Sequence, residues 1–432
     1  MNIFRIVILG FFVLFIVVAV LVFSGIFSFG EEGGSAGVGG EVVLWGTIPE
    51  RTLKAALDQF RLDHSEEFRL SYIEKRAGSF DEELVEALAS GRGPDMILLP
   101  DELIVRHADK MLPIPYESIS LRQFKDSYIE QGELYLRSEG ILALPFLVDP
   151  MVLYWNRDIF TAEGLAEPLS FWDELFILAP KLTNKQSNFT ITRSAIGFGE
   201  YQNIFHAKDI LALLMIQAGE PIVSFGERGL EPVLGDKHGF VDAPATSALR
   251  FYTEFSNSIK DFYSWNRALP LDRDYFTQGN LALYLGYASE FSEIRARNPN
   301  LNFDVRRVPQ VRDTNQFTTL GKMFGIGIVR TSRNPQTAFF ATFLLAQDNV
   351  IEKIIDVTHL SPAQRSLLSK ARGGAQEEVF DHSALIARSW LDPDPKETEG
   401  VFKEMIESVV SGRSSLGQSI SRARENLTNL LR

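Results

Sequence analysis

Residues 79–100 read SFDEELVEALASGRGPDMILLP, and this stretch predicts a helix followed by a buried strand. Ser79 and Glu82 have the spacing of a capping box, which pairs side chains with the backbone at the head of a helix. Two glycines, Gly91 and Gly93, end the helix, and Met96–Leu99 is an apolar run typical of a strand buried on both faces. The apolar residues between these signals share one helical face: Phe80, Leu84, Ala87 and Leu88.

The same alternation precedes this stretch. Val42–Trp45 is a short apolar run suited to a strand, and Phe68–Tyr72 has the pattern of a second strand. Between them lies a helical stripe with i, i+3, i+4, i+7 spacing: Leu53, Ala56, Leu57 and Phe60. Strands separated by helices of about ten to fifteen residues predict βαβ units and a largely parallel sheet.

The pattern becomes more helical after the two extended candidates at 142–146 and 151–155. Strand-like sequence returns late in the chain, at 303–308 and 323–329, and helical stripes follow it up to the C-terminus. Helices dominate three segments of the middle: 171–182, 210–218 and 245–258. This order predicts an α/β protein of two lobes between which the chain crosses more than once.

The amino end carries a long apolar segment. From residue 6 to residue 30 there is no charged side chain, and about 20 apolar residues are enough to span a hydrocarbon core about 30 Å thick. We therefore expect residues 1–30 to form one transmembrane helix in the inner membrane. The alternative is a cleaved secretory signal, for which Ser28 and Gly30 offer small residues, and the protein would then be secreted.

The flanks of this segment predict its orientation. Arg5 precedes the apolar run and Glu31 and Glu32 follow it, which favours a body outside the cytoplasm, in the periplasm or the extracellular space. Residues 31–40, EEGGSAGVGG, are rich in glycine and predict a flexible tether between membrane and body.

Composition excludes several classes of chemistry. The chain has no cysteine, which removes disulfides, thiol nucleophiles, cysteine-ligated metal sites and lipid-modified cysteines. Arg5 is the only charged residue among the first thirty, so the rest of the chain carries a formal charge of −14, against −13 for the whole. An acidic body lacks the cations that release counterions from a phosphate backbone, so nucleic acid is not an expected partner.

Catalytic and cofactor signatures are also missing. The sequence has no P-loop, no G-x-G-x-x-G turn, no G-x-S-x-G elbow, no S-x-x-K pair and no H-E-x-x-H helix. Asp392 and Asp394 begin like a calcium loop, but Glu397 stands where that loop needs glycine. We therefore expect a binding protein without catalytic residues, metal or cofactor.

Seven stretches, in order along the body, resemble a known family. They are VVLWG at Val42, SFDEELVEALASGRGPDMILLP at Ser79, ILALPFLVDPMVLYWNRDIFTAEGL at Ile141, LSFWDEL at Leu169, FYSWNRALP at Phe262, FTQGNLALYLGYASEF at Phe276 and NFDVRRVPQ at Asn302. This ordered set resembles the extracellular solute-binding proteins of sugar ABC transporters, the family of the maltose-binding protein. The resemblance covers the chain from about residue 42 to the C-terminus.

The resemblance implies a two-lobed periplasmic-binding-protein fold of the type II-like kind, with hinge strands near 146–148 and 303–308. Lobe one would comprise residues 41–147 plus 309–348, and lobe two residues 148–308 plus 349–432. It also implies a substrate-binding component of an importer, which closes on a sugar or oligosaccharide and is read by permease subunits. Many relatives begin with a lipid-modified cysteine, and this cysteine-free chain departs from that pattern.

A carbohydrate site needs flat apolar faces for sugar rings and hydrogen-bonding groups for their hydroxyls. Trp45 ends the first predicted strand, at the edge where an α/β sheet places its ligand crevice. Arg76 and Asp101 follow the second and third strands in loops at the same edge, so we expect them to supply polar contacts.

Six further candidates lie in stretches that resemble the family: Tyr154, Trp155, Glu200, Tyr201, Trp265 and Tyr287. The first two adjoin the entry into lobe two, where strand alternation turns one of the pair inward. The next two lie in GFGEYQN, a region that touches sugar in relatives, and the last two match aromatic platforms.

Two other functions are compatible with the sequence. One is a sensor or scaffold module of the same fold that signals to a membrane partner. The other is an anchored carbohydrate-active enzyme, because two catalytic carboxylates need only converge in space.

Overall fold

The computed structural model describes residues 40–432, except residues 189, 228, 313, 315 and 371. The expected membrane helix, and the tether up to residue 39, lie outside the described residues. Within the described part of the chain, no helix combines the length and the apolar character needed to cross a membrane.

The first lobe begins with the predicted βαβ units. Strand β1 (Glu41–Gly46) lies between β2 (Arg69–Glu74) and β3 (Met96–Pro100) and is parallel to both. Helices α2 (Glu50–Asp63) and α3 (Phe80–Ala89) connect these strands. The predicted apolar stripe of α2 is confirmed, because its members are buried: Leu53, Ala56, Leu57 and Phe60.

The predicted capping box at the head of α3 is wrong. Ser79 occupies the N-cap position but makes no capping bond, and its hydroxyl donates to Glu83 Oε1 at 2.7 Å. The short segment Ala77–Ser79 already turns as a 3₁₀ helix, so Ser79 lacks the extended backbone that a capping side chain needs.

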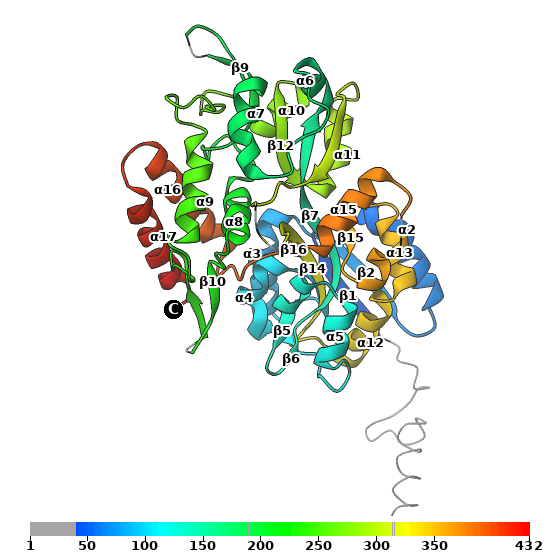
Figure 1. The fold of residues 1–432 in the computed structure, drawn as a ribbon. Coiled ribbons are helices and arrows are strands. Elements are labelled where there is room, and N and C mark those ends of the chain that lie inside the picture. Colours follow the sequence, from blue (N-terminus) through cyan, green and yellow to red (C-terminus); the bar gives the residue numbers. More distant parts are fainter. Residues whose placement is uncertain (1–39, 189, 228, 313, 315, 371) are drawn as a thin grey trace, which may run out of the picture.

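Two long strands join the lobes. Strand β7 (Leu144–Asn156) is antiparallel to β14 (Thr319–Val329) in its first half, and to β12 (Leu281–Tyr287) and β13 (Phe303–Arg307) in its second half. Strand β14 also pairs with β3, so the strands of both lobes belong to one sheet of twelve strands in the described chain. Figure 1 shows β7 running from the lower lobe into the upper one.

The second lobe has its own helices around β12 and its parallel neighbour β9 (Ile191–Ile196). Its principal helices are α6 (Arg157–Ala162), α7 (Leu175–Leu182), α8 (Ala207–Gln217), α9 (Pro244–Glu254), α10 (Asp272–Thr277) and α11 (Phe291–Arg297). A hairpin of β10 (Val223–Gly226) and β11 (Gly229–Pro232) extends from it. The fold is therefore the two-lobed α/β architecture that the sequence predicted.

The last hundred residues return to the first lobe before they end on the second. Helices α12 (Pro335–Leu345) and α13 (Asp348–Ile355) precede α14 (Arg365–Leu368). The chain then passes through α15 (Ala375–Leu385) and β16 (Ala387–Arg388), which pairs with β14. Helices α16 (Pro395–Val410) and α17 (Leu416–Leu430) pack together and against α9, beside the second lobe in Figure 1.

The lobe boundaries remain a prediction, but two helices depart from them. The sequence assigned residues 349–432 to lobe two, whereas α13 packs against α2 and α14 against α5 (Leu121–Ser127), both in the first lobe. The physical reason is the apolar face of α13, which is buried there through Val350, Ile351, Ile354 and Ile355.

Candidate functional site

Two cavities lie along the strands β7 and β14 that join the lobes, and each includes one residue of β14 in its lining. The first, of about 590 Å³, includes Lys322 in its lining, and the second, of about 650 Å³, includes Phe324. Residues two apart on a strand point to the same face, so both side chains rise from one floor. Asp149 of β7 pairs in register with Lys322 and lines the second cavity. We call the two cavities together the interlobe groove.

The second cavity is shared by both lobes. The first-lobe wall is formed by the residues that lead into α2, namely Thr47, Ile48, Pro49, Arg51 and Thr52. The second-lobe wall is formed by Ser289, Ser292 and Glu293 at the head of α11. The segment Val357–Leu360 closes one side. A cavity between two bodies joined by strands is the place where a hinge motion would enclose a ligand.

Asp149 ties the floor of the groove to the second lobe. Its carboxylate accepts hydrogen bonds from the backbone N–H and the hydroxyl of Ser289, at 3.0 and 2.6 Å. Burial raises the pKa of Asp149 to about 6, against the opposing effect of these two bonds. Asp149 is therefore a buried hydrogen-bond acceptor that reaches the groove from the hinge itself.

The first cavity is lined by charges of both signs. The ammonium of Lys322 lies 3.5 Å from the carboxylate of Asp209, which also accepts a hydrogen bond from the Tyr287 hydroxyl at 2.8 Å. Burial alone would lower the pKa of Lys322, but the charges of Asp209, Glu102 and Asp149 outweigh it and raise that pKa. Burial would likewise raise the pKa of Asp209, and Lys322 and His206 hold it below its usual value. Both groups are thus charged near neutral pH.

Aromatic faces are present in the groove. Tyr201 lines the first cavity and donates its hydroxyl to Glu399 of α16. Phe205 is 48% exposed in the same cavity, with the guanidinium of Arg273 at 4.2 Å from its ring centroid. Phe324, partly buried, offers a ring in the second cavity. The groove therefore combines rings with donors and acceptors, as a hydroxylated ligand requires.

The structure brings two of the nine sequence-based candidates to this groove. Tyr201 lines it, and Tyr287 reaches it through the bond to Asp209, although the ring of Tyr287 is covered by the Lys322 ammonium at 4.5 Å. Glu200, next to Tyr201, is buried and pairs with Arg267 at 3.0 Å. Its carboxylate supports the loop and does not line either cavity.

Three aromatic candidates lie in the core of the second lobe. Tyr154 and Trp265 have no exposed surface; the hydroxyl of Tyr154 donates to Tyr287 O at 2.7 Å and the indole N–H of Trp265 to Asn203 at 3.2 Å. Trp155 is 8% exposed and packs edge-on against Phe160. These rings fill the space between strands and helices, so they offer no face to a ligand in this conformation.

The three first-lobe candidates also lie outside the two cavities. Trp45 is 8% exposed and carries the Lys75 ammonium 3.8 Å from its ring centroid. Arg76 is exposed and does not line the groove.

Asp101 is 1% exposed and accepts hydrogen bonds from Gln131 and from the backbone of Met323, at 2.8 and 3.1 Å. Burial raises the pKa of Asp101 to about 6. Asp101 thus anchors the end of β3 to β14 instead of facing a ligand.

The sequence interpretation missed the groove floor. Lys322 is a lone charge inside the apolar strand TLGKMFGIGIV, and Asp149 is a lone charge inside LPFLVDPMVLYWN, of which every residue is buried. A single charge within such a run was the available signal, because an ionised group is buried only where it has partners. Among the described residues, no group of three histidine, aspartate or glutamate side chains is placed to hold a metal.

Comparisons with known proteins show the family of the chain. The model of the family described as "Bacterial extracellular solute-binding protein" matches residues 55–376. The galactooligosaccharide-binding protein of Bacillus subtilis (strain 168) is 20% identical over 406 residues, which cover 90% of this chain and 89% of that protein.

Solved structures share the fold at low identity. An ABC transporter solute-binding protein from Thermotoga lettingae, bound with α-D-tagatose, has a TM-score of 0.69 at 19% identity, covering 91% of this chain and 100% of that chain. An ABC substrate-binding protein from Listeria monocytogenes, in complex with cycloalternan, has a TM-score of 0.69 at 17% identity, covering 91% and 99%. Since the family model matches three quarters of its length, the chain belongs to the bacterial extracellular solute-binding proteins.

Proposed function

We propose that this chain is the substrate-binding component of an ABC importer and that it binds a sugar or oligosaccharide in the interlobe groove. The observation that carries the proposal is the shared floor of the two cavities, where Lys322, Phe324 and Asp149 rise from the hinge strands between walls from both lobes. The oligosaccharide and sugar named for the relatives support the ligand class.

The groove suits a neutral, hydroxylated ligand. Asp149 and Asp209 can accept hydrogen bonds from sugar hydroxyls, and Lys322 and Ser289 can donate them. Tyr201, Phe205 and Phe324 can cover the C–H faces of a ring. Of the nine sequence-based candidates we retain Tyr201 as a direct contact and Tyr287 as the residue that positions Asp209.

Closure would bring the first-lobe wall at Thr47 toward the second-lobe wall at Ser289, and the permease would recognise the closed form. We propose that lobe one comprises residues 41–147 and 309–348 together with helices α13 and α14. Lobe two then comprises residues 148–308 and the remainder of 349–432. A ligand shifts this equilibrium only by its difference in affinity for the two states.

We further propose that residues 1–30 hold the protein in the inner membrane, with the body outside the cytoplasm. The support is the uncharged run from residue 6 to residue 30 and the extracellular character of the family. The intact mass of the protein recovered from membranes would test this, because cleavage after Ser28 or Gly30 removes about thirty residues.

Calorimetry tests the sugar ligand directly. The full chain is purified in a detergent without a sugar headgroup and titrated with monosaccharides, disaccharides and linear oligosaccharides. We expect saturable binding of at least one member, and no binding heat across the whole panel would refute a sugar ligand. The same titration with Tyr201→Ala shows whether the heat comes from the groove.

A further inference from the structure

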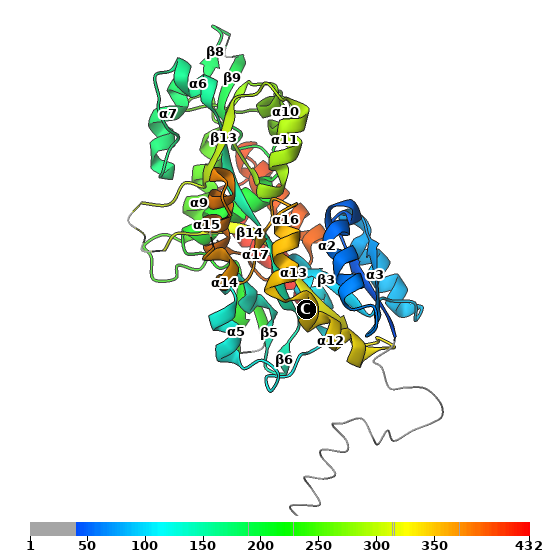
Figure 2. The same ribbon diagram turned by 90° about the vertical axis from the view of Figure 1, so that its right-hand side faces the viewer.

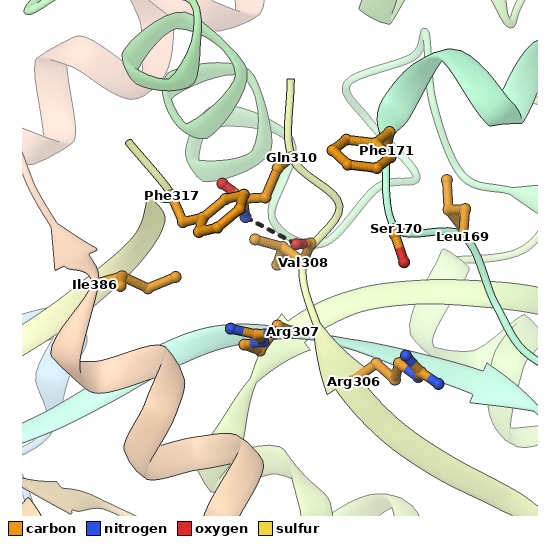
Figure 3. A pocket seen from close by; sticks show the side chains of 9 residues that line it. All are labelled: Leu169, Ser170, Phe171, Arg306, Arg307, Val308, Gln310, Phe317 and Ile386. Carbon is orange, nitrogen blue, oxygen red and sulfur yellow. Dashed lines mark hydrogen bonds between the residues drawn. The ribbon is translucent and has the colours of Figure 1, made fainter. Parts of the chain in front are cut away.

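A separate cavity of about 140 Å³ lies behind the hinge (Figure 3). Its lining includes Phe171, Arg306, Arg307, Gln310, Phe317 and Ile386. None of these residues lines the interlobe groove. In Figure 2 the linker from β13 to β14 stands on the left of the hinge, whereas α11 and α2, which border the groove, lie on the right.

The back wall of this cavity is built and held by hydrogen bonds. Gln310, which is 7% exposed, donates to Val308 O at 2.9 Å and to Thr318 O at 3.1 Å, and accepts from Thr318 N at 2.8 Å. The backbone of Gln310 bonds to Ser170 and Trp172 on the neighbouring segment. These bonds fix the position of Gln310 in the wall of the cavity.

The charge of the lining has one sign. Arg306 and Arg307 contribute two guanidinium groups, and none of the described residues in the lining carries a carboxylate. Arg306 also pairs with Glu167, but the Glu167 side chain is 67% exposed, and such surface pairs contribute little to stability. Guanidinium groups match carboxylates and phosphates in geometry as well as charge.

The remainder of the lining is mostly apolar. Phe171, Phe317 and Ile386 belong to this part of the lining (Figure 3), and Phe317 is 52% exposed. The volume is that of about five water molecules at about 30 Å³ each, enough for a single small ring or a short chain. The ring of Phe171 already carries the Arg312 guanidinium at 4.2 Å from its centroid, so Phe317 and Ile386 are the apolar groups left for an occupant. The occupant that fits is an anion with a compact apolar body, because a bare inorganic anion would leave these two side chains uncovered.

We propose that this cavity is a second binding site, for a small organic acid, and that its occupancy acts on the hinge. Arg306 and Arg307 end β13, and Val308, Gln310 and Phe317 belong to the segment that leads from β13 to β14. Ile386 is the single residue between α15 and β16. An anion held between these residues contacts two of the segments that must deform when the lobes move. The site therefore couples an acid in the surroundings to the affinity of the groove.

Ligand-observed ¹⁹F NMR tests binding with two probes of equal shape, 4-fluorobenzoate and the neutral 4-fluorobenzamide. With the full chain we expect the benzoate to bind at least tenfold more tightly than the amide, and Arg307→Gln to weaken the benzoate at least fivefold. Arg92→Gln, an exposed arginine on the first lobe, is the matched control and should change nothing. Equal binding of both probes, or full affinity in both Arg307→Gln and Arg306→Gln, overturns the site.

Spin labels test the coupling, since the chain has no cysteine of its own. Ser65→Cys on the first lobe and Ser258→Cys on the second are both exposed and accept labels without disturbing the core. We expect saturating 4-fluorobenzoate to change the mean distance between the labels, and the Arg307→Gln background to abolish the change. An unchanged distance at saturation overturns the action on the hinge.

Discussion

Asp149 of β7 and Lys322 of β14 are direct partners in the strand register that joins the two lobes, and each reaches a different cavity of the groove. A hinge strand is normally a place for apolar side chains, because it is buried by both lobes. Here Asp149 and Lys322 carry opposite charges, and both lie on the strands about which the lobes would turn. If the groove binds ligand as proposed, ligand binding and hinge geometry depend on the same two residues.

Lys322→Met should weaken sugar binding about tenfold. The substitution removes an ammonium that can donate to a hydroxyl, and hydrogen bonds to charged groups are worth about 1.5–3 kcal/mol. Calorimetry of the variant against the best sugar of the panel measures the loss. Lys353→Met, an exposed lysine on α13, is the control and should bind as the original protein does. Wild-type affinity in Lys322→Met would remove this residue from the site.

Phe205→Ala and Trp265→Ala should have opposite profiles. Phe205 is 48% exposed in the first cavity, so its loss should lower sugar affinity by about 1 kcal/mol and leave the melting temperature nearly unchanged. Trp265 is fully buried, so its removal should lower the free energy of unfolding by about 3–5 kcal/mol. Thermal denaturation and calorimetry on both variants give the comparison, and loss of affinity in a fully stable Trp265→Ala would show that this ring contacts ligand.

Asp149 should make the protein less stable as the pH rises from about 4 to about 6. Burial raises the pKa of Asp149 from 3.8 to about 6, so in this window the folded state holds a proton that the unfolded state has released. The charge of Glu290 raises the pKa of Asp149 further, and the charge of Lys322 lowers it. Both charges therefore influence the measured dependence of stability on pH.

Urea denaturation of the original protein and of Asp149→Asn, at pH 4.5 and at pH 7.5, isolates this contribution. We expect the stability lost between the two pH values to be smaller in the variant by about 2 kcal/mol, since a shift of one pKa unit is about 1.36 kcal/mol and pH 4.5 lies above the unfolded pKa. Identical pH profiles for the two proteins would mean that Asp149 is ionised in both states throughout this window.

The βαβ units could be predicted from the sequence because their signals are local. The stripe of α2 and the apolar run of β3 both follow from periods of a few residues. The site residues follow from pairings across the whole chain. Asp101 directly follows β3 and Asp149 lies within β7, and only the partner strand decides that the first ties β3 to β14 while the second faces the groove.

The aromatic candidates show the same limit. Trp265 and Tyr154 match the family's pattern in sequence, yet their rings are covered by side chains from segments that are distant along the chain. Phe205 and Phe324 have no distinguishing local context, and their exposure depends on where the lobes part. A motif can predict that an aromatic side chain stands at a given position, but whether a face of its ring is exposed depends on tertiary packing.

Asp394→Ala and Asp394→Ser should separate two roles of one carboxylate. Asp394 caps α16 by accepting from the backbone of Lys396 and Glu397, at 3.1 and 3.2 Å, and it also pairs with Arg106 of the first lobe. Serine keeps a capping oxygen and loses the charge, whereas alanine loses both. We expect alanine to cost about 1 kcal/mol more than serine in urea denaturation. Equal losses for the two variants would show that the contact with Arg106, and not the cap, holds the start of α16 against the first lobe.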